Sequence, residues 1–170
     1  MGSAGVLESI AEVAIALAGF GGVAAGLGYR ARGTWSEDDR LRLILLAGVG
    51  GAVVFACFLP YAIHHLETTP PWRLSSLFFL PISVAFLAYV VWRVSPYPGG
   101  FPAGYSRIMA VVTVANQFAI TFLLLVAAFG DVGTQLFGFY LSATLLTLFQ
   151  AFLFFIRLLV TAFRATGPAA

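Results

Sequence analysis

The chain has 170 residues, of which 61 % are hydrophobic and 9 % are charged. This composition excludes a water-soluble globular domain, because such domains hold about a quarter charged residues. The net charge is only +2 and no soluble face carries a cluster of basic residues, so we expect no nucleic-acid partner. All nine basic residues are arginine, a usage that indicates a bacterial genome of high GC content.

The first apolar stretch is long enough to span a bilayer, because about 20 such residues cover the hydrocarbon core. It carries two carboxylates, Glu8 and Glu12, in its first turns. At about 100° per residue, one helical face leads from these carboxylates through a branched residue and glycines to an arginine. This acidic–glycine face consists of Glu8, Glu12, Ile15, Gly19, Gly22, Val23, Gly26 and Arg30. Beside it, a ladder of small residues at a spacing of four predicts close approach of another helix: Ala14, Ala18, Gly22 and Gly26.

Four further apolar segments follow, separated by residues that start or end helices. Ser36 before three acidic residues predicts an N-cap, and Thr69 before two prolines predicts another. A Pro/Gly-rich loop at 95–104 and a short break at 130–133 separate the later segments. We therefore predict one all-α transmembrane domain over residues 1–170, with five helices at 6–29, 41–66, 72–94, 106–129 and 133–160.

The arginines predict the orientation of this bundle. With the N-terminus outside and the C-terminus inside, eight of the nine arginines lie on the inner side and only Arg73 lies outside. Such a bias follows the positive-inside rule. We therefore expect a multi-pass protein of the bacterial inner (plasma) membrane, in contact with membrane lipid.

In this orientation, several groups that can bind a cation lie at the outer side. They are Glu8 and Glu12 on the first helix, and a candidate outer cation site of His64, His65, Glu67 and Asp131. Pro60 and Pro81 also each remove one amide donor and free a carbonyl oxygen. Carboxylate, imidazole and carbonyl groups suit a bound cation, whereas the alternative is a polar cap wetted by headgroup water. We expect no other cofactor and assign no metal.

A polar stripe follows the last two segments. Its residues are Thr113, Asn116, Gln117, Thr121, Thr144, Thr147 and Gln150. In lipid such side chains mostly bond across helices, and the alternative is the lining of a water-filled path. No catalytic motif is present, so we expect no enzyme. Both histidines lie on one segment, which disfavours a bis-histidine haem site.

Two functions fit these features. The first is a homo-oligomeric, cation-conducting channel with the first helices around a central pore. Glu8 and Glu12 would form outer carboxylate rings, Ile15 or Leu17 an apolar constriction, and Arg30 the inner exit. This order along the helix is similar to that of the pore helix of store-operated calcium channels, a resemblance that covers this one helix. The second function is a non-conducting small subunit that assembles or stabilises a larger membrane complex, with the ladder of small residues as its docking face.

Overall fold

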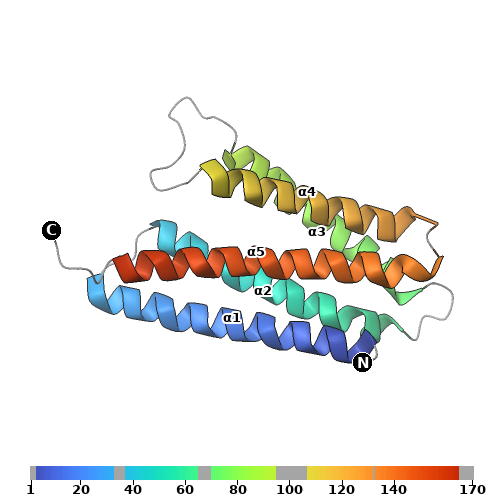
Figure 1. The fold of residues 1–170 in the computed structure, drawn as a ribbon, viewed down its shortest axis with the longest axis horizontal. Coiled ribbons are helices and arrows are strands. Elements are labelled where there is room, and N and C mark those ends of the chain that lie inside the picture. The colour runs from blue at the N-terminus through green and yellow to red at the C-terminus, as the bar shows by residue number, and fades with distance from the viewer. Residues whose placement is uncertain (1–2, 33–36, 65–69, 95–106, 132, 165–170) are drawn as a thin grey trace. The chain divides into compact units, whose positions relative to one another are not determined.

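The computed structural model describes residues 3–32, 37–64, 70–94, 107–131 and 133–164, and all its regular structure there is helical (Figure 1). In chain order the elements are α1 (Ser3–Arg32), α2 (Glu37–Ile63), α3 (Pro71–Val94), α4 (Arg107–Phe129), the 3-10 turn η1 (Gly133–Gln135) and α5 (Leu136–Arg164). Each of the five α-helices is long and apolar enough to cross a membrane. The predicted all-α fold with five helices suited to crossing a membrane is confirmed, and the chain has the build of a multi-pass membrane protein. The orientation of its termini stays a prediction.

The observed helix ends differ from the predicted ones by a few residues. α1 and α5 extend beyond their apolar windows, because polar residues continue a helix once its apolar core has formed. α2 ends at Ile63 rather than 66, and α5 begins at Leu136 because the residues before it form η1. The two predicted caps, Ser36 and Thr69, lie outside the described residues. Pro71 is nevertheless the first residue of α3, where a proline costs no hydrogen bond.

Contacts divide the chain into two compact units. Unit 1 comprises Met1–Cys57 and Thr147–Ala170, and so contains α1, most of α2 and the second part of α5. Unit 2 comprises Phe58–Leu146, with the last turns of α2, the whole of α3 and α4, and the first turns of α5.

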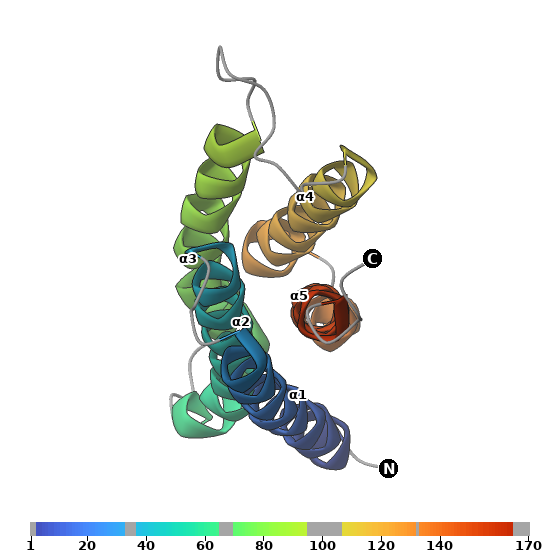
Figure 2. The same ribbon diagram turned by 90° about the vertical axis from the view of Figure 1, so that its left-hand side faces the viewer.

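In unit 1, α1 lies against α2 through small side chains (Figure 2). A Cβ atom added to Gly50 of α2 would lie 3.6 Å from both the Ala14 carbonyl oxygen and the Ala18 Cβ of α1. Gly21 lies so close to Leu46 that an added Cβ would overlap the leucine side chain. Lipid gives helices no hydrophobic drive to associate, so close backbone approach with many dispersion contacts takes its place.

The packed residues of α1 repeat in alternating steps of four and three. They are Leu7, Ala11, Ala14, Ala18, Gly21 and Ala25, all buried or half-buried. A step of four advances about 40° past a full turn, so a ladder of three such steps drifts about 120° around the helix. The ladder therefore does not form a single packed surface within the chain, and close approach is confirmed for its first two members. Its first members, Ala14 and Ala18, pack towards α2, whereas Gly22 and Gly26 are exposed.

In unit 2, α3 and α4 pack side by side (Figure 1). α4 ends in a tight turn in which the Gly130 N–H donates to the Val126 carbonyl at 2.8 Å. A Cβ at residue 130 would lie 2.5 Å from that oxygen, so the turn requires glycine there. Gly133 adopts a φ of +52°, the left-handed region that side chains disfavour.

Substituting Gly133 with alanine is expected to lower the free energy of unfolding by about 1–2 kcal/mol, because a Cβ is strained at positive φ. The matched control is Gly138→Ala inside α5, where an added Cβ meets no atom within 4 Å. That change should be neutral or stabilising by up to about 1 kcal/mol, since alanine favours helix. Thermal unfolding in detergent, followed by circular dichroism, measures both. Equal midpoints for the two variants would contradict the assigned turn.

Candidate functional site

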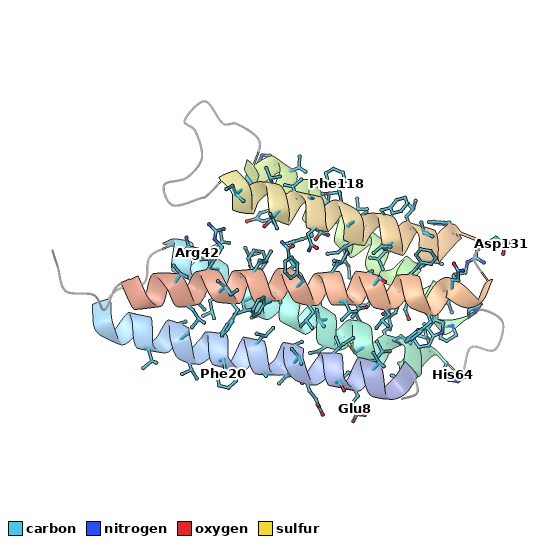
Figure 3. All side chains as sticks on the ribbon, viewed as in Figure 1. Glu8, Phe20, Arg42, His64, Phe118 and Asp131 are labelled. Carbon is cyan, nitrogen blue, oxygen red and sulfur yellow. The ribbon has the colours of Figure 1, made fainter. Side chains whose placement is uncertain are left out.

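The acidic–glycine face of α1 is exposed along its described length. Ile15 is 58 % and Val23 62 % exposed, and the two glutamates and three glycines of this face are also exposed. A Cβ added at any of these glycines, Gly19, Gly22 and Gly26, meets no atom within 4 Å. Figure 3 shows Glu8 pointing outward from α1. Arg30 lies in the last turns of α1, but its side chain is outside the described part.

The position of Glu12 determines which neighbours this face can have. Glu12 lies within the apolar span Gly5–Leu27, about 10 Å from Gly5 at about 1.5 Å per residue. A carboxylate facing lipid costs about 2.5–3.5 kcal/mol at the centre of a bilayer and less towards its edge. Glu8 lies one turn away on the same face, where two like charges repel each other. Water, a cation or a protein partner is therefore a better neighbour for this face than lipid.

α2 adds a second set of open small residues to unit 1. Ala47, Gly48 and Gly51 are exposed, and a Cβ at either glycine meets no atom within 4 Å. The sequence interpretation did not single out these residues. The run of small residues at 47–52, interrupted only by Val49, is the pattern that could have indicated them.

The candidate outer cation site is only partly described. His64 is exposed at the end of α2, where its N–H donates to the Tyr61 carbonyl at 3.3 Å, and Asp131 is exposed after α4 (Figure 3). His65 and Glu67 lie outside the described residues. Within the described ranges, no three His, Cys, Asp or Glu side chains gather as a metal site would require. The outer site stays a prediction.

The polar stripe of α4 packs against α3 through a closed circuit of hydrogen bonds. The Gln117 amide Nε2 donates to the Ser83 hydroxyl oxygen at 2.9 Å and to the Ser83 carbonyl at 3.2 Å. The Ser83 and Thr121 hydroxyls bond at 2.8 Å, and Thr121 donates to the Gln117 carbonyl at 2.9 Å. Because the Thr121 proton is used in that last bond, Ser83 is the donor to Thr121. The packing interpretation is confirmed for these residues, whereas their partner Ser83 was not predicted.

Two other members of the stripe also bond to backbone. Asn116 Nδ2 donates to the Leu146 carbonyl of α5 at 3.0 Å, still within unit 2. The Thr144 hydroxyl donates to the Tyr140 carbonyl at 2.9 Å, one turn earlier in the same helix. These bonds satisfy polar groups that lipid cannot.

Opening the circuit is expected to destabilise unit 2. Ser83→Ala and Gln117→Leu should each lower the free energy of unfolding by about 0.6–2 kcal/mol, the range for interhelical hydrogen bonds in membranes. The double variant should lose less than the sum, because both changes open one circuit. Unfolding in mixed micelles with increasing SDS measures these values. Ser142→Ala, at an exposed position on α5, is the control and should change little. Strict additivity would contradict the circuit.

Comparison of the chain with known protein families, curated proteins and solved structures returns no match.

Proposed function

We propose that the protein is a homo-oligomer in which the α1 helices of several copies meet around a central path for inorganic cations. One observation carries this proposal. The acidic–glycine face is exposed along α1 and combines carboxylates with glycines, neither of which suits contact with lipid. The neighbouring face of α1, about 100° around the helix, is occupied by α2 within the same chain. Assembly of several copies would bring the exposed faces together.

In this assembly each part of the face has a role. Rings of Glu8 and Glu12 would concentrate cations at one mouth, and water in the path would hydrate them. Ile15, 58 % exposed one turn beyond Glu12, would form an apolar constriction that conducts only when wetted. The glycines beyond it would allow the helices to approach closely. With the N-terminus outside the bacterial inner membrane, the carboxylates would lie at the outer mouth and Arg30 at the inner exit.

A second candidate function rests on the open residues of α2. Together with the glycines of α1, Ala47, Gly48 and Gly51 give unit 1 a small-residue surface on two helices. A larger membrane protein could dock there and pair its arginines with Glu8 and Glu12. The chain would then be a non-conducting subunit that assembles or stabilises a complex.

Purification and reconstitution test the proposal. The purified protein should form a symmetric oligomer of one kind of chain and should release a cation gradient from liposomes. Multi-angle light scattering gives the stoichiometry, and a fluorescent cation indicator gives the flux. A chain that is monomeric, co-purifies with a different protein and gives no flux at any voltage, pH or calcium concentration would favour the second function.

A further inference from the structure

Two groups of aromatic side chains lie at the two ends of α3. At its start, the Trp72 ring centroid lies 4.7 Å from that of Phe137 and 6.0 Å from that of Tyr140, both on α5 within unit 2. At its other end, Tyr89 lies 6.3 Å from Trp92. Tryptophan and tyrosine combine an apolar ring with a polar group, and membrane proteins concentrate them where hydrocarbon meets headgroups.

The spacing of the two groups matches a bilayer. Twenty positions separate Trp72 from Trp92, and at about 1.5 Å per residue this is about 30 Å, the thickness of the hydrocarbon core. Arg73, beside Trp72, supports an interface at this level. Its Nε donates to the Ala128 carbonyl in the last turn of α4 at 2.7 Å, so a half-buried positive charge caps the negative end of that helix.

Between these two levels, the exposed residues of α4 form one apolar ridge. They recur in steps of three and four and are Ile108, Val111, Ala115, Phe118, Phe122, Leu125 and Phe129. The large members are between 48 % and 75 % exposed, and Figure 3 shows Phe118 on the outward side of α4. On α3 the exposed residues are likewise apolar in mid-helix, among them Phe78, Ile82 and Val84. Polar side chains at the same height are turned inward, where Gln117, Ser83 and Thr121 bond to one another.

We infer that the exposed faces of α3 and α4 contact the lipid acyl chains of the bilayer. Trp72 and Trp92 mark the two bilayer interfaces. The aromatic spacing fixes the level of the bilayer along α3. Helix–helix contacts in lipid favour small residues, whereas the α4 ridge between the two levels consists mostly of large apolar side chains, so its composition favours acyl chains as the partner. This inference does not depend on the proposed function of α1.

Tryptophan quenching by brominated phospholipids tests the inference. The chain has three tryptophans, Trp35, Trp72 and Trp92, so phenylalanine substitutions leave variants with a single tryptophan at 72 or 92. Phe118→Trp in the tryptophan-free background places a probe on the α4 ridge. Each variant is reconstituted in lipid brominated either near the headgroup or deep in the acyl chain. Phe79→Trp, at a buried position of α3, is the matched control, and circular dichroism checks the fold of each variant.

Lipid brominated deep in the acyl chain is expected to quench the fluorescence of Phe118→Trp strongly. The fluorescence of Trp72 and Trp92 should be quenched more by lipid brominated near the headgroup. Phe79→Trp should lose little with either lipid. Equal quenching of Phe118→Trp and Phe79→Trp would overturn the lipid-facing assignment, since it would mean that protein covers the ridge. Strongest quenching of Trp72 or Trp92 by deep bromines would overturn the placement of the interfaces.

Discussion

Replacing Gly22 with isoleucine is expected to convert the assembled protein into single chains while each chain keeps its fold. Gly22 is exposed, and an added Cβ meets no atom of its own chain within 4 Å. A branched side chain there would instead hold neighbouring α1 helices apart, and small residues are what permit close helix contact in lipid. Association should weaken at least about tenfold, equivalent to about 1.4 kcal/mol. Mass measurement in nanodiscs over a range of protein-to-lipid ratios gives this number.

Gly21 provides the matched control for that change. It is adjacent in sequence but buried against Leu46 of α2, so Gly21→Ile should overpack the interior of unit 1. The expected cost is about 1–3 kcal/mol of folding stability. The two variants should therefore differ in kind, one losing assembly and the other losing stability. If Gly22→Ile stays assembled, or if both changes act alike, the assignment of the exposed face to assembly is wrong.

Replacing Glu12 with glutamine is expected to abolish selectivity for cations over anions. The change removes the charge and keeps the shape, so any effect reports electrostatics rather than packing. Wild-type channels in a tenfold salt gradient should reverse near the ideal cation potential of about 59 mV, and the variant should reverse near zero. Planar-bilayer or liposome-patch recording gives the reversal potential directly.

Two further carboxylates control the Glu12 experiment. Glu8→Gln should have a smaller effect, because Glu8 lies one turn closer to the helix start and to bulk water. Asp131→Asn removes an exposed carboxylate after α4 that belongs to the predicted outer cation site; an unchanged reversal potential in this variant would separate that site from the ion path. Unchanged selectivity in Glu12→Gln would remove this residue from the ion path.

The five helices could be predicted from sequence because the physics of lipid leaves few alternatives. A spanning backbone must satisfy its own hydrogen bonds, so each apolar run of about 20 residues becomes a helix. The exact ends could not be predicted in the same way. The 3-10 turn before α5 begins at Gly133, and hydropathy does not report the positive φ of that residue.

The residues of the candidate site could be predicted from the sequence, but the contacts of α1 with α2 could not. Helical geometry placed Glu12 and Gly22 on one side of α1, and both are exposed. Helical geometry did not reveal which row of small residues on α1 packs against α2, because several neighbouring rows of small residues could accept a helix equally well. Gly21 and its contact with Leu46 were missed for this reason. Ser83 was missed because one serine in an apolar run gives no indication that Gln117 and Thr121 will meet it.

The central claim is that the exposed faces of α1 from different copies meet, and cysteine cross-linking at residue 22 tests it most directly. Gly22→Cys is made in a Cys57→Ala background, which removes the buried native cysteine and leaves one thiol per chain. The variant is then oxidised in native membranes. Phe118→Cys on the α4 ridge serves as the control. A disulfide forms only when the two Cα atoms approach to about 4.4–6.8 Å. Covalent dimers are expected at residue 22 and not at residue 118. Dimers at neither residue, or equally at both, would contradict the proposed contact between α1 faces.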